Sequence, residues 1–305
     1  MGFKFTPRHL SNSTYFSRLK TTVREPIQRL LWTALGPLLH VFASSGMITL
    51  TCSRWDGGGA QIQARYSVEA FSKHFGFPFQ QQSLSTVLPD TSSSILEKWN
   101  DLLGLSGSNV SFTPENCVKP AGMARGLLEA GKAYLGKTPL LIDFDDCHAF
   151  TNLFPSRLES LVPEFRLRAE KALANWEKSF GTPLEEIIVH LRRGLIDDGS
   201  ERLRLTSDST LLEQLKLLRE MYPDYRIRIY TYESSPELEK LVADYAVLDS
   251  KSSEFQVVLA CSRAKVFLMA KSSLSYVAAM LNPNTVFYQE FWHPKLSSWT
   301  KISAG

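Results

Sequence analysis

Residues 187–194 read Ile-Ile-Val-His-Leu-Arg-Arg-Gly, an apolar run that ends in a histidine, two arginines and a glycine. β-Branched residues favour a strand, and the glycine permits the chain to turn where that strand ends. Arginine presents planar, forked donors that match the oxygen atoms of phosphate groups. The stretch therefore predicts a buried strand with an anion site at its carboxyl end. Two surface arginines beside a strand end, with no ligand, explain the same residues equally well.

Apolar and amphipathic segments alternate along the rest of the second half of the chain. Strict alternation of strands and helices with short connections implies parallel strands joined by right-handed crossovers. Sheets of this kind bind ligands at the carboxyl ends of their strands, where residues 190–194 are expected. The expected strands are 186–191, 226–232, 246–248, 265–270 and 285–289, and the expected helices are 207–221, 236–244, 254–263 and 273–281.

The first half repeats the pattern less clearly, beginning with an expected strand over 47–52. Gly181-Thr182-Pro183 is interpreted as a hinge between two lobes. We predict the α/β class, with two Rossmann-like lobes that face each other across a cleft. Helices are expected over 60–75, 94–103, 122–135 and 164–180, and a further strand over 139–144. The predicted parts are an N-terminal extension over 1–45, partly helical or flexible, and α/β lobes over 46–182 and 183–305.

The composition is that of an ordinary globular protein, with 305 residues of which 44% are hydrophobic and 21% are charged. A formal net charge of +3 is too small to indicate a nucleic-acid-binding stripe, so no nucleic-acid partner is predicted. Any bound anion is expected to be small. The four cysteines have neither Cys-x-x-Cys nor metal-ligand spacing, so we predict free thiols and no bound metal. A cytoplasmic setting is favoured, while the membrane periphery and the secretory pathway stay open.

The first 45 residues are basic and rich in Ser and Thr, and residues 30–42 are mostly apolar. Pro37 and His40 interrupt this apolar run, which is shorter than the roughly 18 residues that a membrane span needs. We expect a helix that packs on the body of the protein or lies on a membrane surface. Peripheral membrane contact through this segment therefore stays an open alternative.

A second candidate anion site lies at 271–279, which reads Lys-Ser-Ser-Leu-Ser-Tyr-Val-Ala-Ala. The hydroxyls of Ser272, Ser273 and Ser275 stand where an expected buried strand passes into a helix. Free N–H groups at a helix N-terminus, together with serine hydroxyls, form an anion site, and small residues let the helix pack closely on the sheet. Simple N-capping by Ser272 or Ser273 accounts for the same pattern with one serine.

Gly57, Gly58 and Gly59 follow the first expected strand. Glycines in this place let the backbone approach a sugar or a diphosphate closely at the lobe interface. The spacing is not that of the dinucleotide-binding fingerprint, because Ile62 stands where a third glycine would be. A tight turn without a ligand is the alternative.

The stretch 143–148, Asp-Phe-Asp-Asp-Cys-His, follows the expected strand at 139–144. A carboxylate or an imidazole at a strand end can act as a general base, and carboxylates can also hold a divalent metal. Short acidic clusters in loops are more often simply solvated.

In combination, these motifs resemble those of a known family. Residues 190–194 come first, then the strand 227–232 that leads into Glu233-Ser-Ser, then residues 271–281. They are similar to the motifs of fucosyltransferases that form α1,2 and α1,6 linkages and of protein O-fucosyltransferases. The family pattern is His-x-Arg-Arg-Gly-Asp, a strand ending in a Ser-Asp-type turn, and Ser-Ser-Phe-Ser. The turn at 57–59, followed by Gln61, resembles the glycine-rich turn that opens those enzymes. The likeness spans residues 47–290 in order and is stronger after residue 183.

The resemblance implies a GT-B-like fold, with an acceptor-side lobe over 46–182 and a nucleotide-sugar-binding lobe over 183–305. It also implies GDP-fucose as the donor, inversion at the anomeric carbon, and neither a metal nor another cofactor. Arg193, with Arg192, would stabilise the leaving diphosphate. The base is expected from the acceptor-side lobe, and its candidates are Asp56, Asp146 and His148. The residues expected to bind the donor are His190, Arg192, Arg193, Gly194, Ser272, Ser273, Ser275, Gly57, Gly58 and Gly59.

The sequence departs from the family pattern at three places: Leu195 replaces aspartate, Leu274 replaces phenylalanine, and Tyr276-Val277 replaces a common aromatic pair. Three explanations are open for Leu195. Asp197 or Asp198 could take the place of the missing aspartate, the enzyme could use a different acceptor or donor, or the lobe could bind the nucleotide sugar without transferring it. The expected function is transfer of fucose from GDP-fucose to a glycan or protein hydroxyl, so the partners are a nucleotide-sugar donor and a glycan or glycoprotein acceptor. The alternatives are a transferase of the same fold that uses another nucleotide sugar, and a non-catalytic nucleotide- or glycan-binding relative.

Overall fold

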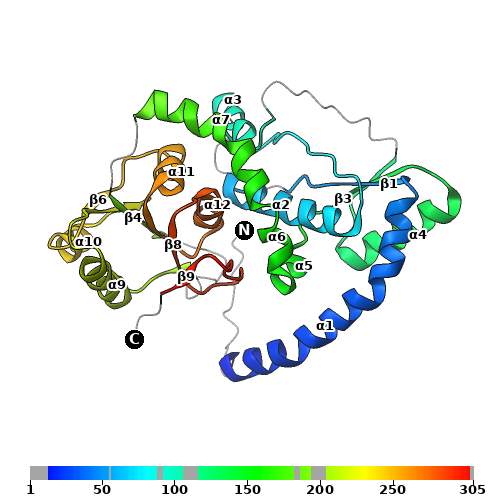
Figure 1. The fold of residues 1–305 in the computed structure, drawn as a ribbon, viewed down its shortest axis with the longest axis horizontal. Helices are drawn as coiled ribbons and strands as arrows, with labels where there is room; N and C mark the ends of the chain where they lie inside the picture. The colour runs from blue at the N-terminus through cyan, green and yellow to red at the C-terminus, as the bar shows by residue number, and fades with distance from the viewer. Residues whose placement is uncertain are drawn as a thin grey trace, which may run out of the picture.

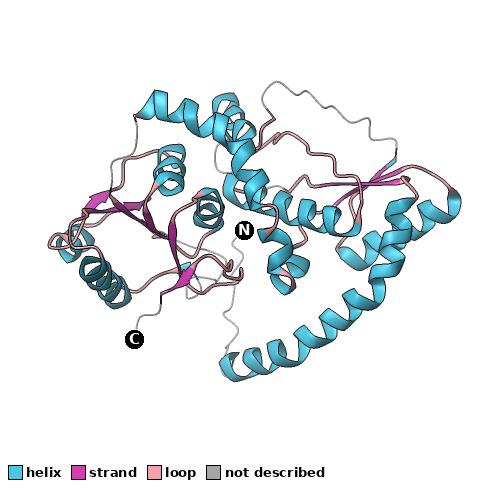
Figure 2. Cartoon of the chain, in the orientation of Figure 1, coloured by secondary structure: helices cyan, strands magenta, loops and turns pink. Residues whose placement is uncertain are grey.

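The chain forms two α/β lobes, each built around a parallel sheet, in the computed structural model (Figure 1). The structure describes residues 13–54, 56–87, 92–105, 116–181, 186–193 and 204–302. Helices cover the strands of both lobes (Figure 2). The predicted class, α/β with two Rossmann-like lobes, is confirmed.

The sheet of the first lobe contains three parallel strands in the order β1-β3-β2. Two of them match predicted strands, whereas β2 has only two residues, too few to show a sequence pattern. Two short helices, α5 and α6, were likewise not predicted. The strands are β1 (Ile48–Thr51), β2 (Cys117–Val118) and β3 (Leu140–Asp143). The helices of this lobe are α1 (Ser13–Ser44), α2 (Gly58–Phe75), α3 (Ser93–Leu102), α4 (Met123–Gly136), α5 (His148–Leu153), α6 (Pro155–Glu159) and α7 (Val162–Phe180).

The sheet of the second lobe contains six parallel strands in the order β6-β5-β4-β7-β8-β9. This is the doubly wound order 3-2-1-4-5-6, in which the direction of winding reverses between the first and fourth strands, here β4 and β7. The strands are β4 (Ile187–Leu191), β5 (Ile227–Thr231), β6 (Val247–Asp249), β7 (Val266–Leu268), β8 (Thr285–Tyr288) and the unpredicted β9 (Thr300–Lys301). The helices are α9 (Asp208–Met221), α10 (Pro236–Val242), α11 (Glu254–Arg263) and α12 (Ser273–Leu281).

A serine caps the N-terminus of each of these four helices, which is why they begin where they do. The side chains of Ser207, Ser235, Ser253 and Ser272 each accept a hydrogen bond from a backbone N–H in the first turn. Ser253 also forms a reciprocal capping box with Gln256. Caps of this kind each contribute about 1 kcal/mol to helix stability.

One apolar core joins the two lobes. The rings of Trp99 and Phe255, which belong to different lobes, lie 5.1 Å apart, and Trp176 lies 5.2 Å from the same phenylalanine. The Trp99 indole also donates a hydrogen bond of 3.0 Å to Glu254. Members of this core include Ile62 and Tyr66 of α2, Trp99 of α3, Phe165 and Trp176 of α7, Phe255 of α11 and Tyr276 of α12. The lobes are therefore held together by shared packing as well as by the covalent connection.

The N-terminal extension is helical from Ser13 to Ser44, and this helix continues through Pro26 and Pro37. Gly181 of the predicted hinge has a φ of +89°, while residues 182–185 lie outside the described ranges. The division of the chain at residue 183 stays a prediction. All four cysteines are free thiols, as predicted.

Candidate functional site

The reversal of winding in the second sheet places the end of β4 beside the start of α12. His190 Nδ1 forms a hydrogen bond with Ser275 Oγ, and this oxygen accepts a second bond of 3.0 Å from the Ala270 backbone N–H. Burial and, second, the nearby Arg192 charge lower the pKa of His190 to about 4. The imidazole is therefore neutral near pH 7. Whether Ser275 Oγ or Nδ1 is the donor in this bond depends on which ring nitrogen carries the proton.

Two of the three serines in the second motif form hydrogen bonds with other groups of the protein. Ser272 caps α12 by accepting a bond of 3.1 Å from the Ser275 backbone N–H, as the N-capping interpretation predicts. The side chains of Ser272 and Ser275 are buried, whereas Ser273 is partly exposed in the first helical turn. Contact of the three serines with a donor stays a prediction, in which the helix N-terminus supplies backbone N–H groups.

Arg193 follows β4 and is held against the segment that leads into α9. Its Nη1 donates a bond of 3.0 Å to the Thr206 carbonyl, and its Nη2 pairs with Asp208. The Thr206 hydroxyl donates to Gln289 at 2.9 Å, so this segment is tied to the end of β8. Arg192 is partly exposed beside it. Gly194, Leu195, Asp197 and Asp198 lie outside the described residues.

The glycine-rich turn of the first lobe meets the second anion motif directly. Gly57 is the N-cap of α2, and Gly58 and Gly59 lie buried in its first turn. A Cβ atom on Gly59 would lie 2.7 Å from Leu274 Cα, and one on Gly58 would lie 2.2 Å from the Trp99 ring. Close packing therefore explains why glycine stands at positions 58 and 59. Contact of the three glycines with a donor stays a prediction.

Arg54, which the sequence analysis missed, joins two of the candidate bases. Its Nη1 lies 2.8 Å from Asp146 Oδ2, and its Nη2 lies 3.0 Å from Asp56 Oδ2. The other oxygen of Asp56 accepts the Gly57 N–H at 2.8 Å, and that of Asp146 accepts the His148 N–H at 3.0 Å. The structure therefore brings Asp56, Asp146 and His148 together, with both carboxylates held in place by the backbone and by one guanidinium.

A histidine from the second lobe completes this cluster. His293, in the connection between β8 and β9, is 4% exposed, and its ring centroid lies 4.8 Å from that of His148. Burial lowers the pKa of both imidazoles; His148 and Arg54 lower that of His293 further, and Asp146 partly offsets the effect at His148. Both rings are therefore neutral near pH 7. His293 lies outside every motif, and nothing in the sequence indicates its contact.

Arg65 is a further cation that the sequence analysis missed. Its side chain, on α2, is 2% exposed, and its Nη1 lies 3.3 Å from the Gln61 carbonyl. Burial lowers the pKa of this guanidinium, whereas the nearby Cys52 and Asp143 oppose the change. Asp143 itself accepts hydrogen bonds from the backbone N–H and hydroxyl of Ser53. A buried positive charge therefore lies close to the carboxyl ends of β1 and β3.

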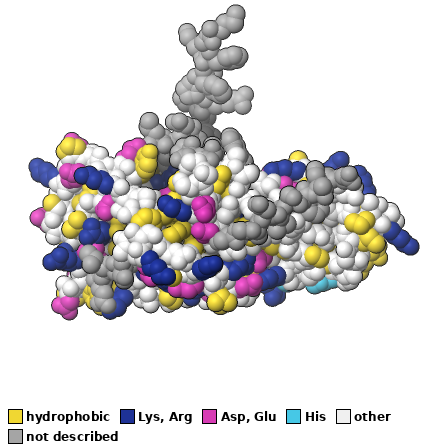
Figure 3. Space-filling view, turned by 90° about the horizontal axis from the view of Figure 1, so that it is seen from above, with side chains coloured by type: hydrophobic (Ala, Val, Ile, Leu, Met, Phe, Trp, Pro, Cys, Tyr) yellow, Lys and Arg dark blue, Asp and Glu magenta, His cyan; other side chains and the backbone are white. Residues whose placement is uncertain are grey.

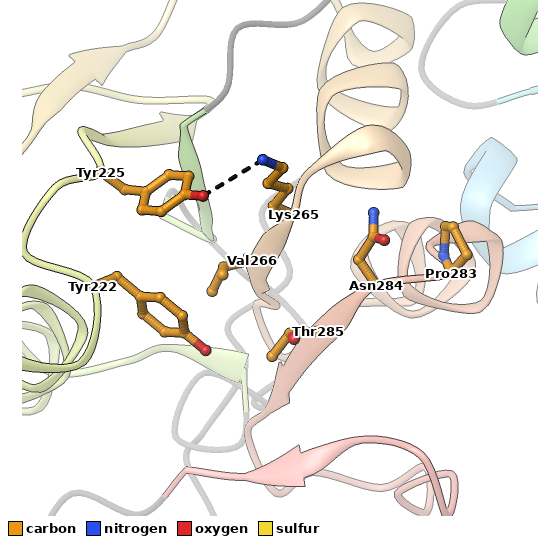
Figure 4. A pocket seen from close by; sticks show the side chains of 7 residues that line it. All are labelled: Tyr222, Tyr225, Lys265, Val266, Pro283, Asn284 and Thr285. Atoms are coloured by element: carbon orange, nitrogen blue, oxygen red, sulfur yellow. Dashed lines mark hydrogen bonds between the residues drawn. The ribbon is translucent and has the colours of Figure 1, made fainter.

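A hollow of about 470 Å³ lies at the other edge of the second sheet (Figure 4). Val266 and Thr285, the first residues of β7 and β8, form part of its wall, so it lies at the amino ends of the strands. Lys265 Nζ lies 3.5 Å from the Tyr225 hydroxyl within it. Its lining is completed by Tyr222, Pro283 and Asn284. This hollow is separate from the residues at the β4–α12 junction.

The surface carries charges of both signs (Figure 3). On the face in Figure 3, Lys and Arg are interspersed with Asp and Glu. Within the described ranges, no three His, Cys, Asp or Glu side chains gather as ligands of a metal ion would.

No protein-family model and no curated protein sequence matches the chain. Among solved structures, POFUT1 in complex with GDP-fucose is similar with 13% identity and a TM-score of 0.47, over 77% of this chain and 94% of that one. E. coli heptosyltransferase WaaC with ADP-2-deoxy-2-fluoro heptose has 15% identity and a TM-score of 0.41, over 85% and 94%. E. coli ADP-heptose lps heptosyltransferase II has 12% identity and a TM-score of 0.37, over 84% and 89%. Similarities at this level assign no residue a role.

Proposed function

We propose that the protein is an inverting glycosyltransferase that transfers fucose from GDP-fucose to a hydroxyl group of a glycan or protein. The observation that carries the proposal is the junction of β4 with α12, where the His190–Ser275 bond links two anion motifs at the reversal point of a doubly wound sheet. Ligands bind doubly wound sheets at this point. The order of the motifs along the chain supports the choice of fucose.

The donor diphosphate would lie between the two arginines and the N-terminus of α12. As the acceptor oxygen bonds to the anomeric carbon, the bond from that carbon to the diphosphate oxygen breaks, and negative charge grows on the departing GDP. Arg192 and Arg193 would stabilise that charge together with the free N–H groups of the helix. The acceptor hydroxyl loses its proton to a base on the first lobe.

His148 is the base that the contacts favour among the three candidates. Asp56 and Asp146 each use one oxygen for a backbone N–H and the other for Arg54. The His148 imidazole is neutral and, within the described residues, forms no hydrogen bond through its ring. His148→Gln should therefore abolish transfer and leave GDP binding intact. Loss of transfer in Asp146→Asn with full activity in His148→Gln would assign the role to the carboxylate instead.

Thermal unfolding with a panel of nucleotides tests the donor assignment. GDP and GDP-fucose should raise the melting temperature, because a ligand at 100 times its Kd stabilises the native state by about 2.7 kcal/mol. ADP and UDP should have smaller effects. Arg193→Ala should abolish the increase, whereas Arg226→Ala, which removes an exposed arginine of the same lobe, should preserve it.

The results of these measurements distinguish a fucosyltransferase from a transferase with another donor and from a non-catalytic binding protein. A larger shift with another nucleotide would assign a different donor to the same fold. GDP binding without hydrolysis or transfer of GDP-fucose would indicate a non-catalytic binding protein. The absence of a shift with GDP or GDP-fucose at millimolar concentration would contradict the donor assignment.

A further inference from the structure

Helix α1 exposes a row of large apolar side chains to solvent. The exposed fractions are 52% for Ile27, 70% for Leu30, 56% for Leu31, 48% for Leu38 and 47% for Val41. Spacings of three, four and seven residues place side chains on one face of a helix. These five residues therefore form a single stripe, which we call the α1 stripe.

A neighbouring face of the same helix is packed on the first lobe. Leu39, Phe42 and Ala43 are buried, and the Trp32 ring lies 5.6 Å from that of Phe71 and 5.7 Å from that of Phe150. Figure 1 shows α1 along the outer side of this lobe, with its N-terminal end projecting past the other helices. The α1 stripe is thus exposed while the helix is docked.

The charge of the chain is unevenly divided around this helix. Residues 1–45 contain six Lys and Arg side chains and a single acidic one, a formal charge of +5, while the whole chain carries +3. The remaining residues are therefore slightly acidic. An apolar helix face within a basic segment is typical of helices that lie on anionic membranes.

We propose that α1 binds the surface of an anionic lipid bilayer, with the α1 stripe inserted at the boundary between headgroups and acyl chains. The basic residues of the segment attract anionic headgroups, and the stripe loses its contact with water. A second copy of the chain fits this face less well, because it would bring two segments of charge +5 together. No described helix is long and apolar enough to cross a membrane.

Vesicle flotation of the full chain tests the proposal, with neutral phosphatidylcholine vesicles and vesicles that also contain phosphatidylserine. The protein should float with the anionic vesicles, and added salt should weaken binding because it screens the headgroups. The double variant Leu30→Glu/Leu38→Glu should reduce partitioning by roughly tenfold or more, since charges oppose burial of the stripe. Leu167→Glu is the matched control, because Leu167 is 77% exposed on α7, away from the stripe, and this variant should bind normally.

Failure to float with anionic vesicles, or equal loss of binding in the control, would overturn the proposal. Light scattering gives a third contradicting result: a dimer that becomes monomeric in the double variant would assign the stripe to a second copy. The GDP-induced rise in melting temperature should be the same in both variants and the wild type. Membrane binding and nucleotide binding can therefore fail independently.

Discussion

Because Gly59 has no side chain, its backbone can lie very close to Leu274 of the other lobe. Its backbone lies so near Leu274 that a methyl group has no room, which brings the N-termini of α2 and α12 together at the candidate site. This contact joins the first-lobe turn, with Asp56 and Gly57, to the second-lobe serines. The candidate site therefore depends on a close approach of two helices as well as on its charged side chains.

Gly59→Ala should destabilise the protein by about 1–3 kcal/mol, because overpacking forces the two helices apart. Urea unfolding measures this change. Gly131→Ala in α4 is the matched control: its Cβ would lie 3.6 Å from the Phe42 ring, an ordinary contact, and alanine is the better helix former. A Gly59→Ala protein as stable as the control would show that the helices are not closely packed.

The neutral state of His190 makes stability depend on pH. Its pKa of about 4 in the folded protein lies below the usual 6.5, so between these values the unfolded chain binds a proton that the folded chain does not. The free energy of unfolding should therefore fall as the pH drops from 6.5 toward 4, by at most about 3 kcal/mol from this residue. His190→Gln should make the acid-dependent loss shallower in urea titrations. An unchanged pH dependence would mean that folding does not lower the pKa of His190.

Helix α12 holds the serine-rich segment at the candidate site. Its N-cap, its contact with β4 through Ser275 and its contact with α2 all lie within the first turn. Ser275 has two partners, the Ala270 N–H and His190, while Ser273 is partly exposed. The two serines therefore have different roles, although they lie two positions apart.

Ser275→Ala should cost about 1–3 kcal/mol, because it leaves the buried Ala270 N–H without an acceptor. It should also weaken GDP binding, since His190 loses the bond that orients its ring. Ser273→Ala, the matched control, should change the free energy of unfolding by less than about 0.5 kcal/mol. Equal effects of the two substitutions in urea unfolding would contradict the distinction.

Local patterns explain why most elements were predictable from the sequence. Strand β4, the serine-capped helices and the α7 stripe of Phe165, Ala169 and Trp176 all follow from periodicity and capping within one segment. The strands β2 and β9 have two residues each and show no period. Their pairing depends on the neighbouring strands β3 and β8.

The candidate site was predictable only in part, because its remaining contacts are long-range. Arg54 and Asp146 are 92 positions apart, and nothing near either residue indicates the other. The contact of His148 with His293 likewise depends on how the lobes pack. Long-range pairs of this kind follow from the fold, so they become visible only with the structure.

The shared core makes the stability of each lobe depend on the other. Trp99 and Trp176 of the first half cover Phe255 of the second, and each fully buried large side chain contributes about 1.5–3 kcal/mol. Separating the lobes would expose both sides of this contact. The chain should therefore behave as one cooperative unit despite its two sheets.

Urea unfolding should accordingly show a single transition, with the same midpoint by tryptophan fluorescence and by far-UV circular dichroism. The shared core predicts this coincidence because separating the lobes would expose its buried side chains on both sides. Two separated midpoints would show that the lobes fold independently. Trp99→Ala should lower the common midpoint without splitting it.

A crystal structure of the complex with GDP would show where the nucleotide binds. We expect the diphosphate between Arg192–Arg193 and Ser272–Ser275, at the carboxyl ends of β4 and β7, with His148 facing the space beside it. Density for GDP in the hollow of Tyr222 and Tyr225, or at any other place away from this junction, would show that the proposed donor site is wrong.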